Sequence, residues 1–467
     1  SLKVGDGFIS DRLDVPKRLV ITTYQTLRDY QFSLCAIDWA VVAFDEAQNI
    51  KNPNALQTRA AKGLKAEFRL LATGTPVENS LADFWCIMDT ACPGFLGSYQ
   101  EFREKYVTPI LRAAGDEVEE IRARVGRTLR NTVGAFMLRR LKEDNLEGLP
   151  QKRLYVGVQD TEWEYLSMLS SVMTGEQLDS YDSVLKATAE SEQNAALAGL
   201  QQLRDVSLHH RLLFGGRLEA PSGRALNDFM AESGKFRSLL ALLNEIQSRK
   251  EKVIIFCVNK RLQAFLSIAL ARHFGLTHLS IINGDVKGVA KTDGGITRKS
   301  LIEAFEGEAG FNVIIMSPVA AGVGLTVVGA NNVIHLERHW NPAKEAQATD
   351  RVYRIGQTKD VNVYIPILSH PELMSFDVNL HQLLSKKALL RDAVVTPEQV
   401  MPTPEGFSQS LFGESKVITY DDVKQLDWQQ FEALTAEVLS DQWKVKGCEL
   451  TASGRDHGAD VILELED

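Results

Sequence analysis

The chain has 467 residues, of which 44% are hydrophobic, and its formal net charge is −9. A chain of this length and composition is expected to fold into about three domains with well-filled cores. Five cysteines without a C-x-x-C pair, and the absence of any run of roughly 18 apolar residues, argue against a disulfide framework, a zinc site and a membrane segment, so we expect a cytoplasmic protein.

The acidic charge is concentrated near the C-terminal end of the sequence. Residues 416–467 hold 12 acidic side chains against 5 basic ones, whereas the preceding residues hold 49 against 47. The larger part is therefore nearly neutral. Affinity for phosphates depends on local lysine and arginine rather than on the sum, so a nucleic-acid partner remains open.

Eight short apolar or β-branched runs, each bounded by turn residues and followed by a helical pattern, predict parallel strands in α/β sheets. The runs lie at residues 18–27, 39–44, 67–76, 252–260, 278–284, 311–317, 331–337 and 361–368. Between about 155 and 233 the runs vanish, and an Ala-, Leu- and Gln-rich composition predicts helices that separate two α/β lobes. A stretch with several prolines at about 394–410 predicts a linker.

The run at residues 39–44 ends on two adjacent carboxylates, Asp45 and Glu46. Ligands bind at the carboxyl ends of the strands in open α/β sheets, so these acids are expected at a ligand site. The pair suits nucleotide hydrolysis, because one acid can hold Mg²⁺, whose charge relieves the repulsion, while the other orients the attacking water. The alternative is a solvated turn after a buried strand.

The run at residues 67–76 ends in small residues that could touch both that site and a bound strand, or simply form a turn before a helix cap. These residues are Thr73, Gly74 and Thr75.

Residues 340–357 predict a helix with Asn341 as N-cap and Pro342 at its first position. Gln347, Arg351 and Arg354 then fall on one face of this helix. Two arginines there could neutralise charge on a transferring phosphoryl group. The alternative is an exposed helix in which these arginines form ion pairs with acidic neighbours.

Together these stretches resemble the Swi/Snf-type ATPases, the DNA-translocating branch of the superfamily-two helicase-like proteins. The resemblance runs through most of residues 19–368, in the expected order, and rests on "VITTYQTL", "DEAQNIKN", "ATGTPVENSLADFW", "FMLRRLKEDNLEGLPQK", "SPVAAGVGLTVVGANNVIHLERHWNP" and "QATDRVYRIGQ". It implies a motor of two RecA-like lobes that binds ATP and Mg²⁺ in the cleft and double-stranded DNA across both lobes.

The resemblance also implies roles for individual residues. Asp45 would hold the metal through water, Glu46 would act as the water-positioning base, and Arg351 and Arg354 would be the arginine fingers. ATP binding and coupling would involve Gln48, Thr73, Gly74, Thr75, Gly324 and Gln347. Contacts to DNA would involve Thr22, Thr23, Lys51, Asn52, Ser317, Gly322 and Trp340. Gly322 and Gly324 suit close approach of the backbone to phosphates, or alternatively a tight turn.

Three departures from the family pattern stand out. The family commonly has His at the position of Gln48 and Gln at that of Glu78. The phosphate-cradling loop G-x-x-x-x-G-K-[ST] does not occur in the sequence. Since that loop precedes residues 18–27 in the family, we expect the chain to be the C-terminal portion of a longer motor that, on its own, binds ATP poorly.

The expected domains are a first RecA-like lobe over residues 1–140, incomplete at its N-terminus, a joining segment with a helical insertion over 141–233, and a second lobe over 234–368. A brace and linker follow over 369–415. Residues 416–467 resemble the opening of an Mrr-like restriction-endonuclease domain, in which Asp460 and Glu432 would form an incomplete Mg²⁺ site. The alternative for this last part is a small accessory α/β domain with a surface acid.

The function that follows is an ATP-dependent double-stranded DNA translocase with helicase-like lobes, coupled in the full-length protein to a nuclease. This layout is similar to that of bacterial phage-defence helicase-nucleases, as in Zorya or DISARM systems, so other defence components are expected partners. Two alternatives stay open: a remodeller that strips proteins from DNA with a C-terminal domain that only binds, and a non-hydrolysing DNA-binding scaffold.

Overall fold

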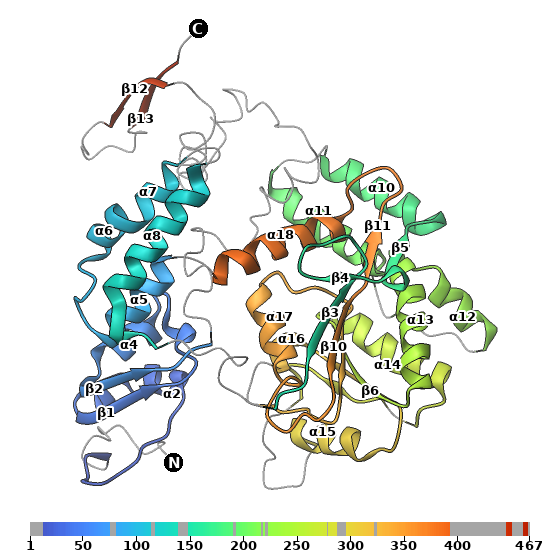
Figure 1. Cartoon of the computed structure of the whole chain (residues 1–467), viewed down its shortest axis with the longest axis horizontal. Coiled ribbons are helices and arrows are strands. Elements are labelled where there is room, and N and C mark those ends of the chain that lie inside the picture. Colours follow the sequence, from blue (N-terminus) through green and yellow to red (C-terminus); the bar gives the residue numbers. More distant parts are fainter. Residues whose placement is uncertain are drawn as a thin grey trace. The chain divides into compact units, whose positions relative to one another are not determined.

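A computed structural model describes residues 13–74, 81–113, 117–138, 148–189, 193–215, 218–219, 223–277, 279–286, 296–321, 325–392, 445–450 and 461–465. The chain forms two compact units (Figure 1). Unit 1 comprises Ser1–Pro76, Leu81–Gly134 and Glu414–Asp467, and unit 2 comprises Val77–Ser80 and Ala135–Gly413. Among the described residues, none of the helices has the length and apolar character needed to cross a membrane.

Unit 1 is built on two parallel strands, β1 (Asp38–Phe44) and β2 (Lys65–Leu71), paired in register from Asp38 with Lys65 to Phe44 with Leu71. Its helices are α2 (Tyr24–Asp29), α3 (Gln31–Cys35), α4 (Leu56–Gly63), α5 (Leu81–Ala91), α6 (Tyr99–Phe102), α7 (Thr108–Leu111) and α8 (Glu117–Val133), with the short turn η1 (Ala47–Ile50) and the π-helical turn η2 (Arg103–Val107). The short turn η3 (Gly134–Phe136) spans the boundary with unit 2. Phe44 and Ile50 are buried in the core between the strands and α2 to α4.

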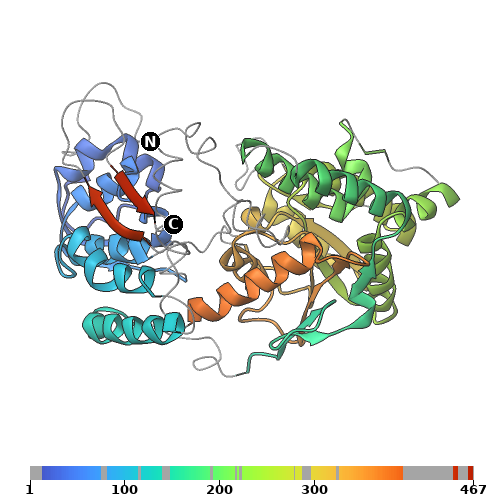
Figure 2. The same cartoon turned by 90° about the horizontal axis from the view of Figure 1, so that it is seen from above.

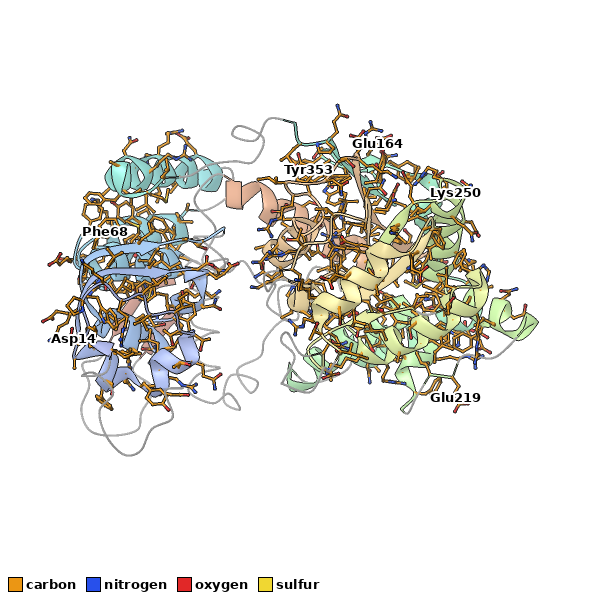
Figure 3. All side chains as sticks on the ribbon, turned by 90° about the horizontal axis from the view of Figure 1, so that it is seen from below. Asp14, Phe68, Glu164, Glu219, Lys250 and Tyr353 are labelled. Atoms are coloured by element: carbon orange, nitrogen blue, oxygen red, sulfur yellow. The ribbon has the colours of Figure 1, made fainter. Side chains whose placement is uncertain are left out.

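The other face of this strand pair carries apolar side chains that stay exposed. Val41 pairs in the register with Phe68, which is labelled in Figure 3, and these two residues are 58% and 59% exposed. Leu70 on the same face is 51% exposed. Parallel sheets are normally covered on both faces, so this strip is unusual surface for a parallel sheet.

The strand predicted over residues 18–27 is wrong. Residues 18–23 are not in a strand, and helix α2 begins at Tyr24. Thr23 caps this helix, because its side-chain oxygen accepts a hydrogen bond from the backbone N–H of Thr26 at 3.1 Å. Leu27 then packs into the unit 1 core, which a helix allows as well as a strand does.

Unit 2 is built on a seven-stranded sheet in which every pairing is parallel, in the order β4-β3-β10-β9-β6-β8-β7. The strands are β3 (Lys152–Val156), β4 (Glu164–Tyr165), β6 (Lys252–Phe256), β7 (Ile281–Ile282), β8 (Asn312–Met316), β9 (Asn332–His335) and β10 (Val361–Ile365). Every residue of β8 and β9 is buried, as expected for central parallel strands. The predicted α/β class with parallel sheets is confirmed.

Helices cover both faces of this sheet (Figures 1 and 2). Val253 and Ile255 of β6 pack on one face with α13 (Gly234–Ser248) and α14 (Lys260–Phe274). Ile254 and Phe256 pack on the other face, where α15 (Arg298–Gly307), α16 (Pro318–Ala321) and α17 (Pro342–Thr349) contribute side chains. The alternation along β6 therefore fills two cores.

The predicted helices between residues 155 and 233 are present as α10 (Gly175–Ala189), α11 (Gln193–Leu208), the short turn η5 (His210–Leu213) and α12 (Arg224–Ala231). Helices α10 and α11 share a core cluster with α18 (Phe376–Asp392), in which Leu203 of α11 packs with Phe376 and Leu380, whereas α12 packs into the sheet core with α13 and α14. The prediction that strands vanish between residues 155 and 233 is wrong in part, because two short strands lie there. β4 pairs with β3 at the edge of the sheet, and β5 (Ser170–Val172), which follows the turn η4 (Ser167–Leu169), pairs in parallel with β11 (Ile367–Ser369). The insertion is thus packed into the second unit.

Two strands near the C-terminal end, β12 (Val445–Leu450) and β13 (Val461–Leu465), pair antiparallel. The predicted nuclease residues Asp460 and Glu432 lie outside the described residues.

Candidate functional site

The carboxylates Asp45 and Glu46 directly follow β1, at its carboxyl end, as predicted. The backbone there continues the pairing for a short distance, because Ala72 N–H donates to the carbonyl of Phe44 at 2.8 Å and Ala47 N–H donates to the carbonyl of Ala72 at 2.9 Å. The loops after β1 and β2 therefore stay side by side, which brings the residues after Leu71 next to the two acids.

Glu46 has a left-handed backbone, with φ 49° and ψ 52°. Three hydrogen bonds hold its backbone: its N–H donates to Asp45 Oδ1 at 3.0 Å, and its carbonyl accepts from both the N–H and the Nδ2 of Asn49, each at 3.0 Å. A side chain in this region costs roughly 1 kcal/mol or more. The turn of η1 (Ala47–Ile50) starts immediately afterwards, so the strained residue sets the direction of the chain at the site.

The Glu46 side chain is oriented by two residues behind it. Gln48, which is buried, donates from Nε2 to Glu46 Oε2 at 2.5 Å, and Thr73 Oγ1 donates to Gln48 Oε1 at 2.7 Å. The structure thus brings together three of the predicted site residues from the ends of two neighbouring strands. This chain of hydrogen bonds can fix a carboxylate that must orient a water molecule.

Tyr24 was missed by sequence reasoning. Its hydroxyl donates to the backbone carbonyl of Asp45 at 2.7 Å, and its ring stacks on Phe44. Burial raises the pKa of Tyr24, and the nearby charges of Asp45 and Glu46 raise it further, so the hydroxyl stays a donor. The only signal in the sequence was a tyrosine within "VITTYQTL".

The remaining predicted residues of unit 1 that the structure describes either pair with other groups or are exposed. Lys51 lies 3.4 Å from the carboxylate of Asp83 in α5. Thr22, Asn52 and Gly74 are exposed, while Thr23 serves as the cap of α2. Thr75 lies outside the described residues.

In unit 2, helix α17 begins as predicted, with Asn341 as N-cap accepting from Ala343 N–H at 2.9 Å and Pro342 in the first position. The helix ends at Thr349, however, so the prediction that Gln347, Arg351 and Arg354 share one helix face is wrong. Only Gln347 lies on the helix.

Tertiary packing ends this helix. Val352 and Tyr353 are buried in the sheet core, and the carbonyl of Arg351 accepts from Val327 N–H at 2.9 Å. Arg354 is exposed and donates to Thr326 Oγ1 at 3.2 Å. The two arginines are therefore carried by a turn that is anchored to the loop before β9, and not by a helix.

The other predicted residues of unit 2 have structural contacts. Ser317 follows β8, and its N–H donates to the carbonyl of Ile282 at 2.8 Å. Trp340 packs edge-on against Phe376, with ring centroids 5.6 Å apart. Gly322 and Gly324 lie outside the described residues.

A cluster of His209, His210 and Glu232 has its ligand atoms within 4.8 Å of one another. Protein partners already occupy it: His209 Nε2 bonds the carbonyl of Phe229 at 3.2 Å, and the guanidinium of Arg211 donates to both oxygens of Glu232 at 2.7 and 2.8 Å. This hydrogen bonding favours a structural junction between η5 and α12 over a metal centre.

Comparison with known proteins places these residues in two family domains. Residues 10–212 match the SNF2-related domain and residues 234–356 match the helicase conserved C-terminal domain. The Zorya protein ZorD of Escherichia coli is 41% identical over 82% of this chain and 34% of that protein. The putative ATP-dependent helicase/translocase YwqA of Bacillus subtilis is 32% identical over 84% of this chain and 39% of that protein.

Among solved structures, the SWI2/SNF2 ATPase core of Sulfolobus solfataricus in complex with dsDNA is 28% identical, with a TM-score of 0.40, and covers 88% of this chain and 75% of that chain. The chain spans little more than a third of the length of the two curated relatives.

Proposed function

The chain belongs to the SNF2-related, helicase-like ATPases, and we propose that it forms the ATP-hydrolysing part of a double-stranded DNA translocase. The observation that carries this proposal is the fixed carboxylate of Glu46. It lies beside Asp45 at the carboxyl end of a strand, and Gln48 and Thr73 orient it. A carboxylate held in this way is suited to orienting a water molecule for attack on a phosphoryl group.

The donor set fits magnesium. Asp45 is exposed, and carboxylate oxygens are the ligands that Mg²⁺ takes in nucleotide sites. Bound with ATP, Mg²⁺ neutralises phosphate charge. We assign Asp45 to hold the metal through water, Glu46 to position the attacking water and Gln48 to sense the terminal phosphate.

In unit 2 we assign Arg351 and Arg354 to neutralise charge on the transferring phosphoryl group, with Gln347 and Gly324 as further nucleotide contacts. Arginine suits this task because its planar guanidinium binds phosphate oxygens through two parallel hydrogen bonds. The anchored turn supports the assignment of Arg351, since a catalytic cation must be held in place.

We assign DNA contacts to Thr22, Thr23, Lys51, Asn52, Ser317 and Gly322. Threonine and asparagine side chains and glycine backbone amides suit phosphate contacts, which position a protein on DNA without reading its sequence. Trp340 is half-buried against Phe376, which supports a coupling role in place of the direct contact expected from the sequence.

The variant Glu46→Gln tests the ATPase proposal in the full-length protein. It keeps the size and hydrogen bonding of the side chain while removing its charge, so we expect DNA-stimulated ATP turnover to fall by about 10² or more, with DNA affinity unchanged. The matched control is Glu67→Gln, an exposed acid on β2. Equal turnover by wild type and Glu46→Gln would refute the assignment, and absence of turnover in wild type would favour the scaffold alternative.

We further propose that the full-length protein couples this motor to a nuclease in bacterial anti-phage defence, in the cytoplasm and with other components of a defence system. The 41% identity to Zorya protein ZorD supports this role. The test is phage plating on cells that carry the intact locus, compared with Glu46→Gln and Asp460→Ala versions. Protection that survives Asp460→Ala would favour the remodeller alternative, in which the C-terminal domain only binds.

A further inference from the structure

The segment that joins β9 to α17, residues 336–341, is held by buried charges from outside the sheet. Lys235 of α13 donates to the carbonyl of Leu336 at 3.3 Å and forms an ion pair with Asp377 of α18 at 2.7 Å. Arg204 of α11 lies 2.9 Å from Glu337 and also donates to the carbonyl of Arg338 at 2.8 Å. Helices that lie far away in the sequence therefore contact three consecutive residues of the segment.

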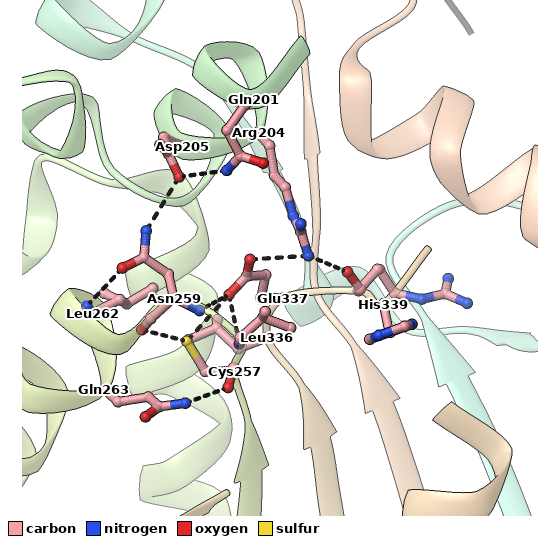
Figure 4. Close-up of polar contacts among 12 residues, drawn as sticks. Gln201, Arg204, Asp205, Cys257, Asn259, Leu262, Gln263, Leu336, Glu337 and His339 are labelled. Carbon is pink, nitrogen blue, oxygen red and sulfur yellow. Dashed lines mark hydrogen bonds and ion pairs between the residues drawn. The ribbon is translucent and has the colours of Figure 1, made fainter. Parts of the chain in front are cut away.

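The Arg204–Glu337 pair is at the centre of this arrangement (Figure 4). Only 8% and 3% of the two side chains are exposed. The second carboxylate oxygen of Glu337 accepts from the backbone N–H groups of Val258 and Asn259 at 2.6 and 2.7 Å. Glu337 thus ties the segment both to α11 and to the loop after β6.

Arg204 also holds the aromatic residue of the segment. Its guanidinium lies 5.5 Å from the ring centroid of Trp340, and Phe376 of α18 packs edge-on against the same ring. A cation in this position is attracted to the ring face. The same guanidinium therefore contacts residues 337, 338 and 340, which spans the segment up to the N-cap of α17.

A buried ion pair is weak evidence for stability, because desolvation of both charges can exceed their attraction. A pair that makes three hydrogen bonds to backbone groups is better explained by a role in positioning the backbone than by a role in stability. Helix α17 starts directly after the segment, and its far end is tied back to β9 by a hydrogen bond of 2.9 Å between His335 Nε2 and Thr349 Oγ1. The turn with Arg351 follows at once.

We propose that Arg204, contributed by the helical insertion, is a positioning residue for the turn that carries Arg351 and Arg354. The inference rests on the proposed ATPase function. Arg204 fixes where α17 begins, and α17, a rigid helix of eight residues or about 12 Å, transmits that position to the arginines. The insertion is in this way part of the machinery that aligns the arginine fingers.

The test compares four variants of the full-length protein for kcat and KM of DNA-stimulated ATP hydrolysis, with the melting temperature of each. Arg204→Met keeps the packing of the stem but loses the charge, and we expect kcat to fall about tenfold or more, with KM for ATP changed less than twofold. Arg204→Lys keeps the charge but not the double contact, and should recover part of kcat.

Two control variants separate positioning from stability. Arg211→Met removes an ion pair of the same insertion that touches Glu232 but no residue of the segment, and it should keep kcat. Leu203→Ala creates a cavity beside Arg204 in α11, so it should lower the melting temperature as much as Arg204→Met does while keeping kcat at a permissive temperature.

The outcomes are distinct. Wild-type protein without ATP turnover would overturn the proposed function itself. Turnover in wild type together with an unchanged kcat in Arg204→Met would overturn only the positioning role. An equal loss of kcat in Leu203→Ala would also overturn it, since a general loss of stability would then account for both variants.

Discussion

The ion pair between Arg338 and Glu345 gives the sharpest prediction for stability. The variant Glu345→Gln keeps the shape of the side chain and removes its charge. Glu345 accepts from Arg338 Nε and Nη2 at distances of 2.7 to 3.0 Å and from His339 N–H at 2.8 Å. Only 7% and 8% of the Arg338 and Glu345 side chains are exposed, so the variant leaves a buried, uncompensated guanidinium.

Breaking such a pair from one side costs about 3–5 kcal/mol. With a urea dependence of about 3 kcal/mol per M for a unit of this size, the unfolding midpoint of unit 2 should fall by roughly 1 M or more. The assay is urea unfolding followed by far-UV circular dichroism and tryptophan fluorescence. The control is Glu303→Gln, whose partner Lys299 is 82% exposed and which should leave the midpoint unchanged.

The same pair determines the direction in which the stability of unit 2 changes with pH. Burial by itself raises the pKa of Glu345, but the charge and hydrogen bonds of Arg338 outweigh it and hold the pKa below the ordinary value of 4.5. The pair therefore contributes its full stability above pH 4.5 and loses it as the pH falls through the lower, folded-state pKa. A midpoint shift under 0.2 M in Glu345→Gln would refute the reasoning that this guanidinium needs a buried counter-charge.

Three further predictions concern other parts of the chain. Gly157→Ala should lower the melting temperature, because the added Cβ would lie 2.2 Å from the backbone oxygen of Leu169, whereas Gly307→Ala, which meets no atom within 4 Å, should not. Thr73→Val should reduce ATP turnover about three- to tenfold without unfolding the chain, since it removes one hydrogen bond to Gln48, and Thr73→Ser should restore it. Stability should also decline from pH 6.5 to 4, by up to about 1.4 kcal/mol per pH unit for each of three histidines, because burial lowers their pKa values to about 4 and the unfolded chain binds more protons. These are His209, His335 and His381. A melting temperature that stays flat over this range would contradict the last prediction.

Some of the fold could be predicted because its signal is local. The strands β6, β8 and β9 each contain a run of apolar residues, and Asn341 and Pro342 are a residue pair typical of the start of a helix such as α17. The pairing of β3 with β10 and of β5 with β11 joins residues about 200 positions apart, so composition along the chain did not indicate it.

The candidate site could likewise be predicted only in part. The positions of Asp45 and Glu46 could be predicted from the point where an apolar run ends. The orientation of Glu46 by Gln48 and Thr73 depends on the contact between two loops, and the role of Arg204 depends on a helix that packs from another part of the chain. The extent of α17 was overestimated because the burial of Val352 and Tyr353 overrides helical spacing.

The left-handed backbone of Glu46 sets stability against activity at one position. A glycine there would adopt the same φ and ψ freely and would relax the turn by roughly 1 kcal/mol, while removing the carboxylate. Selection for the fold alone would therefore favour replacing this residue, and a library screened only for thermal resistance should enrich glycine at position 46 among inactive clones.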